Sequence, residues 1–482
     1  MASPPPPPVD VDLGKLSYEI FSLLESNFLF GAGAGGGGGG VCSLPGTPGR
    51  AFLGGCGGGG KVRVLAIDGC GPGPGDALLA AAALVRLETA LREKAGDGDA
   101  RVADFFDAAG GAGAGGVLAA MLFLKGADGR PRYTAADALA FVAASLGKGG
   151  WRGGMRRRWV AALFRRGSAE RSSLRRVFGE ATLRDTVAPL LVPCYDLATA
   201  APFLFSRADA VESDSFDFRL RDVCAATCAG GATATAVRSV DGRTAIAAAS
   251  GGVAAMGNPT AAAITHVLHN KQEFPLAASV DDLLVVSIGS GSSSGATTTA
   301  PSATPSPGGW RTPLPSRSPS PAEMVRLTAE GVADMVDQAV AMAFGHTCGR
   351  NYVRIQAASP AYKTKALSSL DVKKAAAIAD GMLTQRNVEA ELFRGRRLSE
   401  KSNREKLDAF AAELVKEHER RRTSPGLPNV VIKQVASAAA NAGATPARLS
   451  SATTTSSATA TTARTTVSSM PSPAASLDSG RH

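Results

Sequence analysis

The sequence predicts an α/β fold built on a central, mostly parallel sheet. Val62–Ile67 has the pattern of a short buried strand; a turn rich in glycine and proline (Asp68–Gly75) and an amphipathic helix (Ala77–Lys94) follow it. The same order recurs in a strand over Phe105–Ala109, a glycine turn, and a helix over Val117–Leu124. Two strand–turn–helix units in close succession favour parallel strands joined by right-handed crossovers.

Further elements extend this pattern toward the C-terminus. Short apolar runs rich in β-branched residues predict strands, and apolar residues spaced three and four apart predict helices. The additional strands are expected at Pro189–Tyr195, Phe203–Ser206 and Leu283–Ile288, and the additional helices at Asp12–Phe30, Leu220–Thr227, Thr260–Leu268, Ala322–Phe344, Val372–Leu392 and Glu405–Arg421.

The composition divides the 482 residues into four parts. Of the 30 residues from Gly31 to Gly60, 16 are glycine, which is typical of a flexible linker. Stretches rich in Ser, Thr, Pro and Ala cannot bury a core and are expected to be disordered. We therefore expect an N-terminal helix and linker (1–61), a domain core (62–267), a C-terminal part with packing helices and a disordered insertion at 291–321 (268–433), and a disordered tail (434–482).

The bulk composition excludes several classes of protein. Charged residues make up 20% and apolar residues 44% of the chain, too ordinary a balance for a fully disordered protein. No run of about 18 apolar residues predicts a transmembrane helix. The segment Met1–Pro8 lacks the basic start and apolar stretch of a signal peptide. Together with seven scattered cysteines, these features predict a cytoplasmic protein with reduced thiols that associates with membranes peripherally.

The cysteines and histidines do not have the spacing of a metal site. Cys224 and Cys228 lie four residues apart, but His266 and His269 do not complete a zinc pattern with them. We expect the two histidines to serve helix packing and a surface contact, and we expect neither a metal nor a cofactor.

Most of the net charge of +10 comes from one segment. Trp151–Arg176 holds nine arginines and one acid, Glu170, and is +8 by itself. Arginine pairs well with phosphates and tryptophan favours the membrane–water interface, so an anionic membrane surface is the favoured partner. Nucleic acid is the disfavoured rival because no nucleic-acid-binding motif accompanies the charge, and a solvated basic helix pair is the simplest alternative. The candidate binding residues are Arg156, Arg157, Arg158, Trp159, Arg165 and Arg166.

The first glycine turn fits only one of three anion-binding patterns. Its glycines do not give the dinucleotide fingerprint, and Gly60-Lys61 precedes the strand and lacks a following Ser or Thr, so it is not a phosphate loop. An oxyanion loop needs only closely approaching glycines and free N–H groups, which the turn offers. Its candidate residues are Gly69, Cys70, Gly71 and Gly73.

The second glycine turn has the outline of a nucleophile elbow. Gly111-Ala-Gly-Ala-Gly115 follows a strand and opens a helix, as the pattern G-x-S-x-G requires. The central residue is Gly113, so neither a hydroxyl nor a thiol stands at the nucleophile position.

Together, the motifs resemble those of the plant patatin-like lipid acyl hydrolases, most closely the divergent branch that lacks the usual serine. Val64-Leu-Ala-Ile-Asp-Gly-Cys-Gly71 is similar to L-x-I-D-G-G-G, and Phe106–Gly116 to F-D-x-x-x-G-T-S-T-G-G. Leu191–Asp196 and Phe218–Thr227 match the middle strands and helix of the family. Gly251–Thr260 resembles D-G-G-x-x-x-N-N-P, and Leu284–Gly291 resembles L-x-x-S-L-G-T-G.

The resemblance implies a three-layer α/β domain of the cytosolic-phospholipase type and hydrolysis of phospholipid or galactolipid esters. Such enzymes use a Ser–Asp dyad and a loop arginine. The Ser position corresponds to Gly113, the Asp position to Ser250 or Gly251, and the arginine position to Gly73. The residues present therefore predict an inactive or very weak hydrolase.

Two other interpretations remain open. Cys70 or Ser250 is expected near the same crevice and could act as a displaced nucleophile, although Cys70 also fits as a small residue where the family has glycine. Alternatively, the chain is a non-catalytic lipid- or membrane-binding regulator. Protein partners are unknown. Asp68 is expected to accept hydrogen bonds from loop N–H groups rather than to transfer protons.

Overall fold

The computed structural model describes residues 60–69, 74–147, 169–229, 235–249, 256–289, 321–357, 372–391, 395–423 and 430–432. The chain divides after Gly58, and every described element belongs to the second unit, Gly59–His482. The helix expected at Asp12–Phe30 and the tail expected from 434 lie outside the described residues, as does the 291–321 insertion apart from Pro321, the first residue of a helix.

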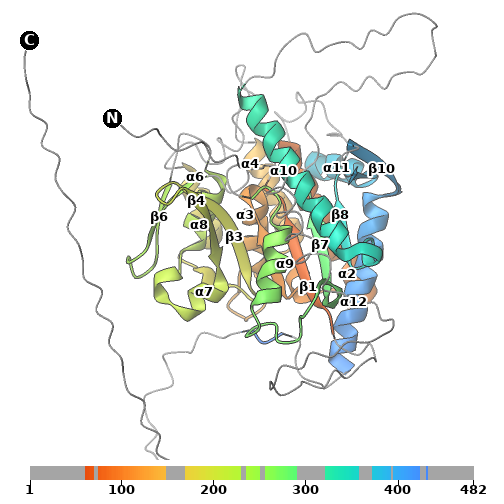
Figure 1. Ribbon diagram of the computed structural model, residues 1–482, viewed down its shortest axis with the longest axis horizontal. Coiled ribbons are helices and arrows are strands. Elements are labelled where there is room, and N and C mark those ends of the chain that lie inside the picture. The colour runs from red at the N-terminus through yellow and green to blue at the C-terminus, as the bar shows by residue number, and fades with distance from the viewer. Residues whose placement is uncertain are drawn as a thin grey trace, which may run out of the picture. The chain divides into compact units, whose positions relative to one another are not determined.

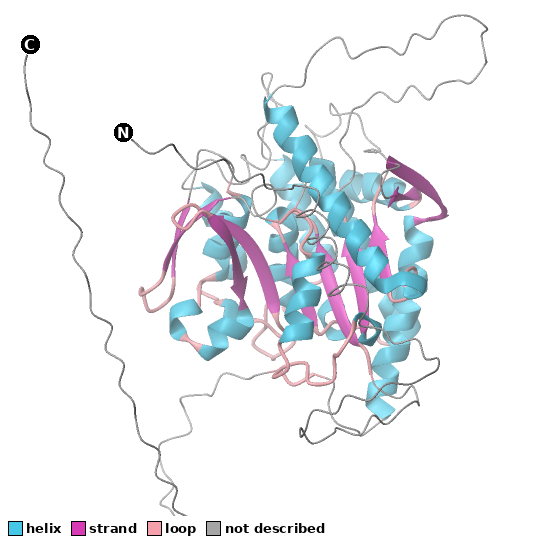
Figure 2. Ribbon diagram, viewed as in Figure 1, coloured by secondary structure: helices cyan, strands magenta, loops and turns pink. Residues whose placement is uncertain are grey.

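An eight-stranded mixed sheet lies at the centre of the second unit (Figures 1 and 2), in the order β5-β6-β3-β2-β1-β7-β8, with β4 paired to β3. The adjacent strands β3, β2, β1, β7 and β8 run parallel to one another. Strands β4, β5 and β6 pair antiparallel with their neighbours. The predicted α/β class is confirmed. The strands are β1 (Val62–Ile67), β2 (Ala108–Gly111), β3 (Leu190–Asp196), β4 (Ala201–Ser206), β5 (Thr235–Arg238), β6 (Ala245–Ala249), β7 (Leu283–Ile288) and β8 (Tyr352–Ile355).

Helices cover both faces of the sheet, which gives the three layers. In Figure 1, α9 (Thr260–His269) and α10 (Pro321–Phe344) cross in front of the central strands. The larger apolar cluster on the opposite side of the sheet includes residues of α2 (Pro74–Ala95), α3 (Gly113–Phe123), α4 (Ala135–Gly147), α6 (Ala169–Phe178), α8 (Leu220–Cys228), α11 (Val372–Leu383) and α12 (Asn403–Thr423). The short α7 (Arg207–Glu212) follows β4.

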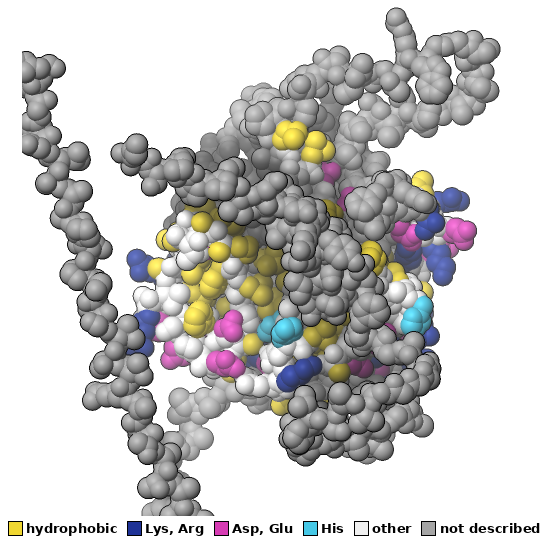
Figure 3. Space-filling view, viewed as in Figure 1, with side chains coloured by type: hydrophobic (Ala, Val, Ile, Leu, Met, Phe, Trp, Pro, Cys, Tyr) yellow, Lys and Arg dark blue, Asp and Glu magenta, His cyan; other side chains and the backbone are white. Residues whose placement is uncertain are grey.

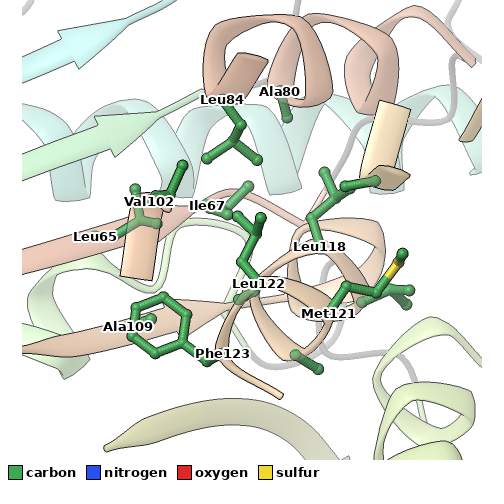
Figure 4. Close-up of a cluster of buried hydrophobic side chains, with 14 of the residues drawn as sticks. Leu65, Ile67, Ala80, Leu84, Val102, Ala109, Leu118, Met121, Leu122 and Phe123 are labelled. Carbon is green, nitrogen blue, oxygen red and sulfur yellow. The ribbon is translucent and has the colours of Figure 1, made fainter. Parts of the chain in front are cut away.

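The alternation of side chains along β1 explains why the strand is buried on both sides. Leu65 and Ile67 join the larger apolar cluster with α2 and α3, which Figure 4 shows in close-up. Val62 and Val64 join the smaller cluster on the α9 and α10 side. A parallel strand covered by helices on both faces must be apolar at nearly every position, as this one is.

One predicted helix ends early. The helix expected over Val372–Leu392 stops at Leu383, and Arg386–Glu391 forms β9, which pairs antiparallel with β10 (Gly395–Ser402). The side-chain amide of the buried Asn387 donates to the backbone carbonyl of Arg354 at 2.8 Å. The backbone N–H of Val388 donates to the backbone carbonyl of Gln356. These contacts override the helix propensity of the local sequence.

A buried ion cluster ties the C-terminal helix to the sheet. Asp107, at the entry to β2, pairs with Arg63 of β1 at 2.9 Å and with Arg421 of α12 at 2.8 Å. Burial alone would raise the pKa of Asp107, but the two guanidiniums outweigh it and hold that pKa below its ordinary value. The cluster lies at the amino ends of the parallel strands, whereas the glycine turns follow their carboxyl ends. Asp107 therefore serves to anchor α12.

Candidate active site

The two glycine turns meet because their strands are parallel neighbours. Ile67, the last residue of β1, stands beside Gly111, the last residue of β2. The chain leaves both strands at the same edge of the sheet, which is where ligands bind in open α/β folds. Asp68 and Gly69 consequently lie against the first turn of α3.

Gly113 keeps the backbone conformation of an elbow but leaves no room for a side chain. Its φ is +51°, a left-handed value that favours glycine. Its N–H donates to the Thr227 hydroxyl at 2.9 Å, and that hydroxyl donates to the Pro193 carbonyl at 2.7 Å. A Cβ placed on Gly113 would lie 2.3 Å from the carbonyl oxygen of Gly69. Any larger residue at 113 therefore requires the Asp68–Gly69 backbone to shift.

Gly115 is required by close approach between backbones. A Cβ there would lie 2.4 Å from the carbonyl oxygen of Asp68 and 2.5 Å from that of Ile67. A Cβ on Gly111 would likewise lie 2.5 Å from the carbonyl oxygen of Gly115. The elbow glycines thus allow α3 to begin directly against the end of β1.

The start of the predicted oxyanion loop is held by backbone hydrogen bonds. The N–H of Asp68 donates to Ile288 of β7 at 2.9 Å, and the N–H of Gly69 donates to Gly257 at 2.8 Å. The N–H of Gly69 is therefore already engaged. Cys70, Gly71 and Gly73 of the same loop lie outside the described residues, as do both candidates for the Asp position, Ser250 and Gly251.

Asp68 binds a buried arginine. Its carboxylate pairs with Arg354 of β8 at 2.6 Å. The loop N–H groups from Cys70 to Gly73, from which Asp68 is expected to accept hydrogen bonds, lie outside the described residues. The same guanidinium donates to Ser287 of β7 at 2.7 Å and lies 3.7 Å from the carboxylate of Asp337. Burial raises the pKa of Asp68, and the adjacent Arg354 opposes that rise.

A wider polar network surrounds this pair on the α9 and α10 side of the sheet. The Tyr352 hydroxyl donates to Asp337 of α10 at 2.5 Å, and the Thr260 hydroxyl of α9 donates to Ser287 at 2.9 Å. All of these side chains are buried. We did not predict the network from the sequence. The available signal was Arg354 inside the apolar run of β8, since a charge in a buried strand requires a buried partner.

Two of the described cysteines, Cys194 and Cys224, are unsuited to nucleophilic attack. Burial raises the pKa of Cys194 to about 12, and burial also raises the pKa of Cys224. Both thiols are therefore protonated at neutral pH, and only a thiolate attacks efficiently. The described residues contain no group of three or more His, Cys, Asp or Glu placed to hold a metal ion.

His266 has the packing role expected of it. Burial lowers its pKa to about 4, so the ring is neutral, and it lies edge-on to Phe274 with 6.3 Å between ring centroids. His269, at the last position of α9, is exposed.

Comparison with known proteins identifies the family. A family model described as Patatin-like phospholipase matches residues 65–264. "Patatin-like protein 3" of Oryza sativa subsp. indica is 53% identical over 419 residues, covering 85% of this chain and 92% of the relative. The chain belongs to the patatin-like family.

Two other patatin-like relatives resemble the chain over similar lengths. "Patatin-like protein 7" of Arabidopsis thaliana is 44% identical and covers 88% of this chain and 85% of its own length. "Probable inactive patatin-like protein 9" of the same plant is 38% identical, and the match covers 84% of this chain and 94% of that relative. The similarity to these plant proteins therefore extends over most of both chains.

The predicted membrane-binding residues of this patatin-like chain, Arg156, Arg157, Arg158, Trp159, Arg165 and Arg166, lie outside the described residues. Arg175 and Arg176, at the end of the same basic segment, are exposed on α6. None of the described helices is long and apolar enough to cross a membrane.

The space around each glycine predicts opposite effects on stability for two glycine-to-alanine substitutions, one in the elbow and one on α10. Gly115→Ala places a methyl group against two backbone carbonyls and should lower the free energy of unfolding by at least about 2–3 kcal/mol. Gly331→Ala, in α10 with nothing within 4 Å of the added Cβ, should raise it by about 0.5–1 kcal/mol. Urea unfolding measures both, and equal stabilities would contradict the described packing.

Arg354→Met should destabilise the protein in a pH-dependent way. The loss of Arg354 leaves Asp68 buried without its cation, which costs about 3–5 kcal/mol at neutral pH. A carboxyl with a raised folded-state pKa contributes full stability below its unfolded pKa and loses it as pH rises through the folded pKa. The deficit relative to wild type should therefore be smaller at about pH 5 than at about pH 7.5.

The matched control for this experiment is Arg397→Met, because Arg397 forms an exposed ion pair with Glu389. It should cost less than about 1 kcal/mol, with no comparable change over the same pH range. A deficit for Arg354→Met that is small or independent of pH would show that Asp68 does not depend on this arginine.

Proposed function

We propose that this patatin-like chain binds a lipid acyl ester at the edge of the sheet where the glycine turns meet, and hydrolyses it at most slowly. The observation that carries the proposal is Gly113. The elbow conformation is retained there, yet the position has no nucleophile and the Gly69 carbonyl fills the space that a side chain would need. The substrate class, phospholipid or galactolipid, follows from the family.

The hydroxyl beside Gly113 does not substitute for the absent serine. Thr227 is fully buried; its oxygen accepts from the Gly113 N–H and its proton is donated to Pro193. No base lies among these partners to activate it. In serine hydrolases, removal of one member of the catalytic set costs about 10⁴–10⁶-fold, and further losses cost little more.

The elements that remain favour binding over bond cleavage. The amino end of α3 carries a partial positive charge from its helix dipole and no acidic residue in its first turn. This end can attract the carbonyl oxygen of an ester, and such polar stabilisation alone leaves about 10³-fold acceleration over water. The chain would therefore act as a lipid-binding protein with residual esterase activity.

A hydrolysis assay tests the proposal. Purified full-length protein incubated with phosphatidylcholine or a galactolipid should release fatty acid no more than about 10³-fold faster than the uncatalysed reaction. Gly113→Ser should stay within about tenfold of wild type, because the Gly69 carbonyl obstructs the new side chain and the Asp of the dyad is also replaced.

Cys70→Ala and Ser250→Ala serve as the decisive comparisons. Rapid turnover by the wild type that either substitution abolishes would refute the proposal and identify a displaced nucleophile. Rapid turnover that both variants retain would also refute it. Comparable slow rates in all four proteins are the expected result.

We further propose that the basic segment Trp151–Arg176 attracts the protein to anionic membranes. Each arginine near such a surface contributes up to about 1 kcal/mol. Replacement of Arg156, Arg157, Arg158, Arg165 and Arg166 by Gln should reduce sedimentation with phosphatidylglycerol vesicles by at least about tenfold at low salt. Binding to neutral phosphatidylcholine vesicles should be unaffected. Unchanged binding to the anionic vesicles would disprove this role.

A further inference from the structure

Helix α10 exposes an apolar stripe that the fold does not use. Met324, Leu327, Val332, Met335 and Met342 are between 46% and 67% exposed. Met324 and Met335 are 11 residues apart and Met335 and Met342 are seven apart, which correspond to about three and two helical turns. These methionines therefore lie along one line that runs for about 27 Å.

None of the described residues of α10 that are exposed carries a charge. A helix that merely faces water normally has Lys, Glu or Arg on that side. From Gly331 to Phe344 the only charged residues are Asp334 and Asp337; Asp337 is buried and Asp334 is half-buried. The exposed positions are Met324, Leu327, Thr328, Gly331, Val332, Met335, Ala339, Met342 and Ala343.

The opposite side of the same helix contacts the candidate site. The Asn258 amide donates to the carbonyl of Ala333 at 3.3 Å, and Asp337 lies beside the arginine that pairs with Asp68. Val340 and Phe344 pack into the smaller apolar cluster. A helix is about 10 Å thick, so the stripe lies about that far from the polar network of the site.

We propose that this stripe of α10 docks the protein onto a lipid surface, with the helix lying in the plane of the membrane interface. The proposal deepens the lipid-binding function proposed above and rests on it. The methionine and leucine side chains enter the boundary between headgroups and acyl chains, and the polar network that holds Asp68 lies on the opposite side of the docked helix. Figure 3 shows apolar side chains at the amino end of α10, at the top of the view.

Three observations favour a membrane over a protein partner. A stable protein–protein interface takes about 20–30 residues on each side, whereas the stripe offers nine exposed residues on one helix. The chain carries a net charge of +10, which complements an anionic membrane. Helix α10 is not apolar enough throughout to span a bilayer, and one apolar face is the feature of helices that lie at its surface.

Vesicle sedimentation with the full-length protein tests the proposal. The double variant Met335→Glu/Met342→Glu should bind vesicles of phosphatidylcholine with a minority of phosphatidylglycerol roughly tenfold more weakly than wild type. The loss should persist at about 1 M salt, which screens the contribution of basic residues. Met335→Leu/Met342→Leu should bind like wild type, because leucine keeps the face apolar.

The matched control is Leu398→Glu, which changes another apolar side chain that is 54% exposed, on β10. It should leave vesicle binding within about twofold of wild type. Vesicle binding that the double variant retains in full would overturn the proposal. A wild-type dimer without vesicles, dissociated by the double variant, would overturn it in favour of an interface between copies.

A separate ligand distinguishes failure of docking from failure of the proposed function. Short-chain phosphatidylcholine, kept monomeric, can reach the site without a membrane surface, and its binding should be equal in wild type and the double variant. If wild type does not bind this monomer but its vesicle binding still depends on Met335 and Met342, the proposed function fails and the docking surface stands.

Discussion

The backbone contact between Gly69 and Gly113 is the constraint on which the candidate site depends. Two parallel strands end side by side, and the turns that follow them touch so closely that a Cβ on Gly113 would lie 2.3 Å from the Gly69 carbonyl oxygen. A nucleophilic side chain needs that space. The glycine at position 113 is therefore matched by a main-chain arrangement that closes over the position, and the residue and the packing support each other.

The contact is held in place from the far side of the sheet. Asp68 stands next to Gly69, and Arg354 of β8 fixes its carboxylate while also binding Ser287 of β7. Asp337 brings α10 into the same network. One helix thus stabilises the glycine turn on its inner side and presents an uncharged, methionine-rich stripe on its outer side. This arrangement connects the geometry of the site with the surface that we propose meets the lipid.

The sequence was sufficient for the local elements that carry strong patterns. Val62–Ile67 and Leu283–Ile288 form strands within the predicted bounds because both are continuous apolar runs, and the glycine spacing at 111, 113 and 115 predicted the elbow. The contacts between distant segments were not predictable. The pair of Asp68 and Arg354 is separated by 286 residues, and Arg386–Glu391 becomes a strand only because β10 and the end of β8 supply its partners.

The most direct test of the central claim is whether the wild-type protein contains an activated serine. Full-length protein would be treated with a fluorophosphonate, which forms a covalent adduct with an activated serine, and its intact mass would then be measured. Our account predicts an unmodified mass, since Gly113 offers no atom to phosphonylate and the Thr227 hydroxyl is buried and engaged. A stoichiometric adduct would contradict the account, and peptide mass mapping would then locate the residue that carries it.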